Sequence, residues 1–504
     1  MPNNRTKEGV LFMYISIQHF LEKGIEKLKE VEKAFLTNPT DMASFVIGIT
    51  EEVHKLGLEI IKETLESTDD EIRKDSKRKD SWYVERSDNK CLTTSLGDVR
   101  FRKTYYQNKA TGEYEYLLDR LLEIDSHERL TEDAEAKMLQ EVVEAPYRKA
   151  GEETSLQSSV SKQTVKNKIH NLEFPKYNVE RDKKEVEYLY IDADEDHVHL
   201  QFKETKGDLE TDENNRKNNC VLSKIVYVYE GIEREAPESK RHRLIEPHYF
   251  CGVYDGAENK DLWDEVYEYL DSKYDLDKVK KIYLNADGGA WIKSGKNRIA
   301  GITYVLDEFH LQKYIFKATS HMLDSQDDAA RAIKDAIKEG TKADFEAVMQ
   351  DIYGYADTEA CQKRITDTKK YILSNWMAAK IRLRDRKTII GSSTECHVSH
   401  VLSSRMSSRP MGWSRLGCDK MSHLRAYYFN KGDMLELVRY QTKTLAKAAG
   451  AESDYEFLSF AKVKASEKNN NYAIGKYYDQ LQVSVENDKI AKQFNLRRTI
   501  RNFL

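Results

Sequence analysis

The chain has 504 residues, of which 39% are hydrophobic and 33% are charged, and its net charge is −5. This length exceeds that of one ordinary domain, and the apolar fraction excludes a wholly disordered chain. Only 7 prolines and 23 glycines are present, so the composition favours long helices over an all-β protein.

Cysteine usage and the N-terminal sequence indicate a cytoplasmic protein. The six cysteines are scattered without a CxxC pair, which is typical of reduced thiols and gives no zinc-ribbon signal. The apolar run VLFMYISI ends at Gln18 and His19, far short of a membrane span, and it lacks the basic start of a signal peptide. We therefore expect no membrane association.

The first 120 residues are predicted to form two regions. Residues 1–75 contain GIEKLKEVEKAF and EEVHKLGLEIIKETLES, in which apolar residues recur every three or four positions, as in helices. Residues 76–120 begin with a charged break and contain the β-type segments SWYVERS, CLTTSLGDVRFRKTYYQN and GEYEYLL. An N-terminal helical region should therefore precede a small β-containing region.

Residues 121–180 are predicted to be a helix-turn-helix-like DNA-binding region. A helical segment with a break near Pro146 precedes VSKQTVKNKIHNL, in which Ser161 is a suitable N-cap. The second helix of such a motif enters the major groove, so its first turns contact DNA. The residues predicted to do so are Lys162, Gln163, Lys166 and Asn167. The alternative is a helical hairpin that binds nothing.

The central part of the chain predicts a mixed α/β sheet. The β-type segments VEYLYIDADEDHVHLQF, SKIVYVYEG and HYFCGVYDG precede a helix, KDLWDEVYEYLDSKY. Strands then alternate with helices in KVKKIYLNADGGAWI and GITYVLDEFHLQKYI, and nearly everything from Leu311 to about residue 386 is expected to be helical. The tail beyond Leu435 has a helical pattern again.

A basic segment lies within this acidic chain. Between Lys380 and Lys447 there are 14 Lys and Arg against 5 Asp and Glu, a net charge of +9 that leaves −14 for the remainder. Such a module is typical of a localised polyanion site, and the alternative is a solvated helical face. Its stretch STECHVSHVLSSRMSSRPMGWSR holds a single acid, Glu395, followed by serines and arginines.

Acidic residues also stand at predicted strand ends. Asp192 and Asp194 share one face of a strand, and Asp287 stands where LNAD meets two glycines. Carboxylates among apolar residues are unfavourable without a partner, and oxygen ligands of this kind suit Mg²⁺ or Mn²⁺. The alternative is an exposed edge strand with surface acids. An EF-hand is excluded because His197 and Lys203 stand where Gly and Glu are required.

Two smaller groups have competing interpretations. Asp307 and His310, in DEFH, follow another strand and suggest either a functional pair or an ordinary helix N-cap with a buried histidine. Cys396, His397 and His400 suggest zinc, but they lack the second ligand pair that a tetrahedral site needs.

Together these segments resemble the ISLre-type bacterial insertion-sequence transposases, also catalogued as an uncharacterised protein family and related to the Mutator-like transposases. The segments that carry the resemblance are YIDADEDHVHLQ, LNADGGAWIK, YVLDEFHLQKYI and, most specifically, ECHVSHVLSSRMSSRPMGWS. Their order and spacing match from about Tyr188 to Trp413.

The resemblance implies a multidomain α/β protein with a ribonuclease-H-like mixed-sheet core. Residues 181–320 would form the first part of the core, residues 321–390 an all-helical insertion, residues 391–440 the core completion that carries the catalytic glutamate, and residues 441–504 a helical tail. A DDE triad would fall on Asp194, Asp287 and Glu395, with Asp192 a less favoured first acid. Asp307 and His310 would occupy the D-x-x-H signature.

The implied activity is cleavage and strand transfer of an insertion sequence, with two Mg²⁺ or Mn²⁺ ions held by the three acids. Terminal inverted repeats and target DNA would be the partners, the active complex would be a homo-oligomer, and the DNA-bound protein would associate with the nucleoid. The basic segment would hold the DNA backbone through Arg405, Arg409 and Arg415. On a helix that continues from Glu395 and ends at Pro410, Arg405 and Arg409 would share one face and the serines between them would donate to phosphate oxygens, whereas Trp413 is expected to be a packing residue rather than a base-stacking one. A nuclease that cuts without joining and a domesticated, non-catalytic DNA-binding protein are the alternatives.

Overall fold

The computed structural model describes residues 15–125, 127–177, 182–201, 219–385, 388–390, 394–409 and 411–448. The predicted tail therefore lies outside the described residues from 449 onward. The chain divides into two compact units: one comprises residues 1–141, 147–165 and 438–504, and the other comprises residues 142–146 and 166–437. Within the described ranges no helix combines the length and the apolar character needed to cross a bilayer.

The first unit begins with helices, as predicted. These are α1 (Ile15–His19), the π-helical turn η1 (Phe20–Gly24), α2 (Ile25–Thr37), α3 (Met42–Lys74) and α4 (Ser76–Ser81). Asp41 starts α3 by accepting a hydrogen bond from the Ser44 amide at 3.1 Å. Farther along α3, Leu58, Ile61 and Leu65 recur at helical spacing and pack against the core of the adjacent sheet.

That sheet contains β1 (Trp82–Thr93), β2 (Asp98–Asn108) and β3 (Tyr114–Glu115). The sequence predicted a strand break after Ser87, but β1 continues through it and the chain reverses at residues 94–97. The third predicted strand is mostly wrong: after two paired residues the chain enters α5 (Leu117–Leu121), because Leu117 and Leu118 are fully buried against the sheet.

Three further helices occupy the predicted helix-turn-helix-like region: α6 (Glu132–Val142), α7 (Tyr147–Glu153) and α8 (Lys162–His170). The predicted cap at Ser161 is confirmed, since its Oγ accepts a hydrogen bond from the Thr164 amide at 3.1 Å. The boundary between the two units runs through α6 and α8.

The second unit is built on a five-stranded mixed sheet in the order β10-β9-β4-β5-β8. Its strands are β4 (Tyr188–His199), β5 (Cys220–Tyr229), β8 (His248–Gly252), β9 (Lys281–Ala286) and β10 (Ile302–Leu306). β4, β9 and β10 run parallel, whereas β5 is antiparallel to both of its neighbours. A hairpin that the sequence did not predict, β6 (Gly231–Arg234) with β7 (His242–Ile245), interrupts the path from β5 to β8.

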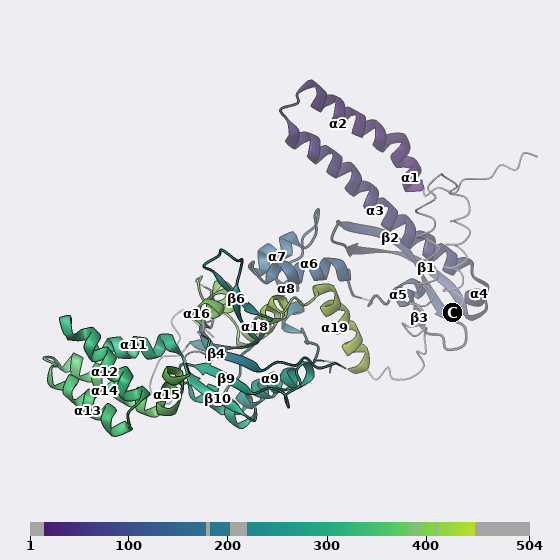
Figure 1. Ribbon diagram of the computed structural model, residues 1–504. Coiled ribbons are helices and arrows are strands. Elements are labelled where there is room, and N and C mark those ends of the chain that lie inside the picture. Colours follow the sequence, from purple (N-terminus) through teal and green to yellow (C-terminus); the bar gives the residue numbers. More distant parts are fainter. Residues whose placement is uncertain are drawn as a thin grey trace, which may run out of the picture. The chain divides into compact units, whose positions relative to one another are not determined.

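Helices cover the sheet and extend beyond it. They are η2 (Gly256–Glu258), α9 (Asn259–Lys273), α10 (Ala290–Lys293), η3 (Ser294–Asn297), α11 (Glu308–Thr319), η4 (Leu323–Ser325), α12 (Gln326–Lys338), α13 (Lys342–Gly354), α14 (Glu359–Ser374), α15 (Trp376–Arg384), α16 (Thr394–His397), the π-helical turn η5 (Val398–Ser403), α17 (Ser404–Met406) and α18 (Arg415–Phe429). The last described helix, α19 (Met434–Ala448), crosses the boundary between the two units. Figure 1 shows α12, α13 and α14 gathered at one end of this unit, as expected for a helical insertion between β10 and α16.

The central strand β4 separates two chemically different faces. Leu189, Ile191 and Ala193 point into an apolar core that includes Leu262 and Trp263 of α9. On the opposite face, the rings of Tyr190, Tyr229 and Tyr283 stack with centroids 5.4 to 5.8 Å apart. Asp192 and Asp194 belong to this second, polar face because side chains alternate along a strand.

Candidate functional site

Strand register brings three aspartates to one edge of the sheet. Asp192 of β4 is paired with Asn285 of β9, so Asp194 lies level with Asp287, just beyond the last paired residues. Leu306 of β10 is paired with Ala286, so Asp307 also falls next to Asp287. Parallel strands end at the same edge of their sheet, and this is why acids far apart in the sequence meet.

A cavity of about 370 Å³ is lined by all three aspartates together with Glu395 and His310. Ala193, Ala286, Phe309, Thr394 and Cys396 complete its lining. Backbone contacts position Asp287: its Oδ1 accepts a hydrogen bond from the Gly289 amide at 2.9 Å, and its carbonyl accepts one from the Tyr371 hydroxyl of α14 at 2.5 Å. A residue of the helical insertion thus helps to hold the backbone of Asp287, the second predicted acid, in place.

The acids are close enough to interact electrostatically but do not form a preassembled set of metal ligands. Among the described residues, no three His, Cys, Asp or Glu side chains stand close enough together to hold a metal ion. The pKa of Asp194 is nevertheless raised from 3.8 to about 7, mainly by burial and also by the negative charges of Asp287 and Glu395, against the opposing effect of a hydrogen bond from the Glu195 amide. A cation would remove this repulsion, and three carboxylates provide the oxygen donors that Mg²⁺ and Mn²⁺ prefer.

The raised pKa of Asp194 predicts a pH-dependent stability difference. The unfolded chain releases this proton near pH 4 and the folded protein near pH 7, so the wild-type protein loses stability as pH rises through that window. The Asp194→Asn side chain has no carboxyl group to ionise, so this variant does not bury a negative charge at high pH. It should therefore be more stable than wild type by on the order of 2 kcal/mol at pH 8. Urea unfolding in EDTA between pH 4 and pH 8 measures the difference. A difference independent of pH would contradict the assignment.

Asp307 and His310 form a pair at the start of α11. Asp307 Oδ2 accepts a hydrogen bond from the His310 amide at 2.9 Å and lies 3.1 Å from Nδ1 of its ring. The Asp307 hydrogen bond, followed by the charges of Asp307, Asp287 and Asp194, raises the pKa of His310 against the opposing effect of burial. The N-cap interpretation is confirmed for Asp307, and both residues also line the acid cavity.

Asp192 lies one step deeper in the sheet, apart from the cavity lining. Its side chain is 1% exposed and accepts hydrogen bonds from the Tyr227 hydroxyl at 2.8 Å and from Nδ2 of Asn285 at 2.6 Å. These protein donors satisfy a buried carboxylate without a metal. The environment therefore favours Asp194 over Asp192 as the first acid.

Sequence reasoning missed Arg382 of α15, which lies beneath the acids. Its guanidinium is 1% exposed and donates to the Asn285 side chain at 2.6 Å and to the Leu306 carbonyl at 2.8 Å. Asn285 stands two residues before Asp287, and Leu306 stands one residue before Asp307. Arg382 thus connects the insertion to the two strand ends that present acids. Nothing in its local sequence marks it, because the partners come from distant strands.

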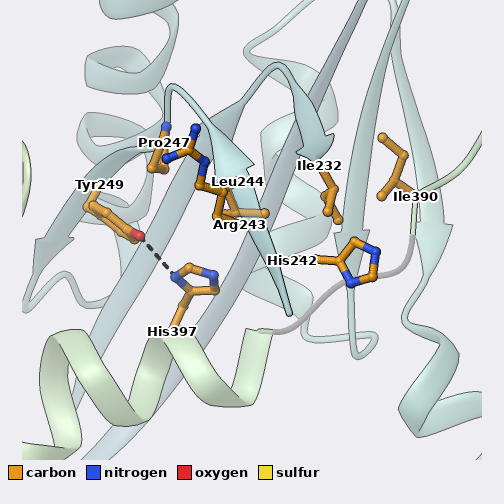
Figure 2. Close-up of a pocket in the computed structure, with 8 residues that line it drawn as sticks. All are labelled: Ile232, His242, Arg243, Leu244, Pro247, Tyr249, Ile390 and His397. Carbon is orange, nitrogen blue, oxygen red and sulfur yellow. Dashed lines mark hydrogen bonds between the residues drawn. The ribbon is translucent and has the colours of Figure 1, made fainter. Parts of the chain in front are cut away.

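The helix that carries Glu395 separates the three residues considered for zinc. Cys396 lines the acid cavity, whereas His397 lines a second cavity of about 650 Å³ beside the β6–β7 hairpin. Figure 2 shows His397 turned toward Tyr249, whose hydroxyl lies 2.9 Å from Nδ1. His400 packs against the Phe429 ring at a centroid distance of 4.8 Å. The three side chains therefore have separate surroundings, which argues against a shared zinc ion.

The structure corrects the predicted role of Arg405. Its side chain is 3% exposed, donates to the Val142 carbonyl at 3.2 Å and lies over the Trp413 ring at 4.9 Å from the centroid. The predicted shared helical face with Arg409 is wrong because the helix ends at Met406, between the two arginines. Trp413 is a buried packing residue, as favoured from sequence.

Other polar residues of the basic segment also serve the fold. Ser407 donates to Asp196 at 2.9 Å, and Ser404 accepts a hydrogen bond from the fully buried Arg425, so neither serine has the predicted phosphate-facing role. Arg415 is exposed and forms an ion pair with Asp255 at 2.6 Å. Arg409 is exposed, and the predicted helix end at Pro410 lies outside the described residues. The net positive charge of this segment therefore does not mean that all of its arginines are on the surface and available to bind DNA.

The four residues predicted to read DNA from α8 are all exposed: Lys162, Gln163, Lys166 and Asn167. Val165 and Ile169, on the opposite side of the same helix, are fully buried. One side of α8 is therefore buried and apolar, and the other side is exposed and polar. This arrangement is compatible with the predicted recognition helix.

Comparison with known proteins identifies a family without an assigned activity. The model described as "Uncharacterised protein family (UPF0236)" matches residues 35–444. Two UPF0236 proteins of Caldanaerobacter subterraneus subsp. tengcongensis are each 35% identical to this chain, covering 90% of it and 93% and 94% of their own lengths. A UPF0236 protein of Streptococcus gallolyticus is 24% identical and covers 68% of this chain and 72% of its own.

Among solved structures, a Drosophila P element transposase strand transfer complex matches 65% of this chain and 84% of its own chain. The sequence identity is 10% and the TM-score is 0.20. A TM-score of this size does not establish a shared fold.

Proposed function

The chain belongs to the uncharacterised protein family UPF0236, and we propose that it is a DDE transposase that cuts and joins the DNA ends of an insertion sequence. One observation carries this proposal. Asp194, Asp287 and Glu395, which come from a central strand, a neighbouring strand end and a helix after a long insertion, line a single cavity. Phosphodiester chemistry uses such carboxylate sets to hold divalent metal ions.

The proposed core is ribonuclease-H-like. Its support is the mixed five-stranded sheet in which only β5 runs antiparallel to the other strands. A helical group separates β10 from the helix that carries Glu395, as a transposase of this type requires. The first and second acids would then belong to the central strand and its parallel neighbour.

We propose that Asp194, Asp287 and Glu395 hold two Mg²⁺ or Mn²⁺ ions. When bound, these ions would activate the attacking oxygen and stabilise the leaving oxygen of the phosphodiester. The support for these ions is the chemistry of the donor set: three carboxylates line one cavity, and burial together with the charges of Asp287 and Glu395 raises the pKa of Asp194. Asp192 is not included, since tyrosine and asparagine donors occupy its carboxylate.

The chain's own residues would position the DNA for two successive attacks. In the first, a water oxygen attacks the phosphorus at the element's end and the 3′ oxygen leaves; in the second, the freed 3′ hydroxyl attacks target DNA in line. His310, held through Nδ1 by Asp307, would use Nε2 to donate to an oxygen of the scissile phosphate. Its raised pKa favours the protonated, cationic ring beside an anion.

The relatives give independent support for a mobile element. The name of one Caldanaerobacter relative joins eleven locus designations, and another joins four. A protein encoded at many loci of one genome is what repeated transposition leaves behind. We propose that the partners of this chain are terminal inverted repeats and target DNA, that it acts as a homo-oligomer because two ends must be cut, and that it associates with the nucleoid.

An assay with labelled terminal-repeat DNA, Mn²⁺ and purified protein tests this function. Cleavage at the repeat boundary followed by a strand-joined product is the expected result. Cleavage without any joined product would instead indicate a nuclease. Sequence-specific binding with no cleavage, by a protein that unfolds cooperatively, would indicate a domesticated DNA-binding protein.

End recognition is assigned to the exposed face of α8. Replacing Gln163 and Asn167 with alanine should reduce discrimination between terminal-repeat and random DNA by roughly 10-fold or more, because both side chains would contact base edges. Competition gel shifts measure the ratio. Lys162→Gln is the control: it should remove only a phosphate contact and so reduce the affinity for terminal-repeat and random DNA equally. Unchanged discrimination in the double variant would exclude α8 from sequence recognition.

A further inference from the structure

The outer face of α11 carries aromatic side chains that the fold does not bury. Phe309 and Phe316 are 56% and 60% exposed, although phenylalanine is among the residues most often buried. They are seven residues apart, and Lys313 and Lys317 are exposed on the same face. On the opposite face Leu311 and Ile315 are buried in the main core, so α11 is firmly seated while its aromatic–basic face is open.

This face begins at the acid cavity. Phe309 lines the cavity, and its ring meets the His310 ring edge-on at a centroid distance of 5.5 Å. From Phe309 to Phe316 the helix rises about 10 Å, which exceeds the spacing of about 3.4 Å between neighbouring nucleotides of a duplex strand and so spans more than one nucleotide. Any strand whose phosphate lies over the acids would therefore have α11 beside its next few nucleotides.

The charge on this face favours a polyanion over an apolar protein partner. The Lys313 ammonium lies 5.5 Å from the centroid of the Phe309 ring, and the Lys317 ammonium lies 4.9 Å from that of Tyr314. In the part of the chain that the structure describes, no carboxylate forms an ion pair with either ammonium. Aromatic rings interleaved with cations are the combination that binds single-stranded nucleic acid, through base stacking and phosphate neutralisation.

We propose that the outer face of α11 binds a single-stranded segment of DNA at the cleavage site, with Phe309 stacking on the base next to the scissile phosphate. Phe316 would stack on a base farther along the same strand, and Lys313 and Lys317 would contact the phosphates between them. This inference rests on the proposed function, because it places the DNA strand over the acid cavity. It adds that the DNA must be locally unpaired there.

The test is fluorescence anisotropy of the full-length protein in EDTA, with single-stranded and duplex oligonucleotides of equal length. Combined Phe309→Ala and Phe316→Ala should weaken single-strand binding by roughly 10-fold per ring and duplex binding by less than about 3-fold. Phe309→Trp should retain binding, because the larger ring still stacks. Tyr355→Ala is the matched control, since Tyr355 is 68% exposed on the insertion, outside this face, and should change nothing.

A second measurement isolates the lysines. Combined Lys313→Gln and Lys317→Gln should lower the slope of log affinity against log salt by about 1.4 for single strands, the value for two phosphate contacts. Wild-type single-strand affinity in the phenylalanine double variant, with cooperative unfolding intact, would overturn the proposal. Because these measurements need neither metal nor cleavage, ring-dependent binding by a protein that never cuts DNA would support this inference while refuting the transposase function.

Discussion

Asp194→Asn, Asp287→Asn and Glu395→Gln should each reduce DNA cleavage by roughly 10³-fold or more while leaving the fold and end binding intact. Each substitution keeps the shape of the side chain and removes one negative charge from the cavity that all three line. The folded protein should not be weakened, because charge repulsion within the cavity decreases. Single-turnover cleavage of labelled terminal-repeat DNA in saturating Mn²⁺, with urea unfolding of each variant, measures both effects.

A surface carboxylate provides the matched control. Asp264→Asn removes an acid of α9 whose side chain is 40% exposed and forms an ion pair with Arg298, so its cleavage rate should stay within about 2-fold of wild type. Asp192→Asn should keep substantial cleavage activity but lose stability, because its carboxylate belongs to the buried hydrogen-bond network. Wild-type activity in Glu395→Gln would show that the third acid lies elsewhere, and Glu308 would be the next residue to test.

Arg382→Met should lower the free energy of unfolding by about 3–5 kcal/mol. The substitution leaves the Leu306 carbonyl and the Asn285 side chain without their donor, and it leaves the buried Asp192 carboxylate without a nearby positive charge. Arg384→Met is the matched control: this arginine is two residues away and exposed, so its loss should cost less than about 1 kcal/mol. Urea unfolding measures both variants.

A double variant separates the lost charge compensation from lost packing. If the cost of Arg382→Met comes largely from the uncompensated carboxylate, adding Asp192→Asn should recover part of the lost stability, because the buried charge is then neutral. Equal stability of Arg382→Met and wild type would show that the guanidinium does not connect the insertion to the strand ends. Additive losses in the double variant would show that packing, not charge, determines the cost.

The sequence predicted the elements whose periodicity is local. The helical patterns of residues 24–35 and 51–67 became α2 and α3, and the N-cap at Ser161 was confirmed, because these features depend on neighbours within one or two turns. The alternation of acids along β4 correctly placed Asp192 and Asp194 on one face. The short β6–β7 hairpin was missed, because its sequence GIEREAPESKRHRLI has little apolar alternation.

Nearby residues of the same type have different environments in the structure, and the sequence alone could not predict which residue would be buried. Asp192 and Asp194 are two residues apart, yet one is held by Tyr227 and Asn285 and the other lines the acid cavity. Arg405 and Arg409 are four apart, yet one is buried and the other is exposed. In each case the partners that bury one residue come from another part of the chain, such as the Val142 carbonyl that accepts a hydrogen bond from Arg405.

The helix-rich α/β character of this protein, its family and its small set of candidate acidic and basic residues could all be predicted from the sequence. Which of those residues meet depended on the tertiary structure. Strand register aligned Asp194, Asp287 and Asp307 at one sheet edge, and the helix after the insertion brought Glu395 to the same cavity. Local sequence patterns determine whether a segment forms a helix or a strand. Whether a charged side chain makes a structural contact or lines a cavity depends instead on burial and on partners from distant elements.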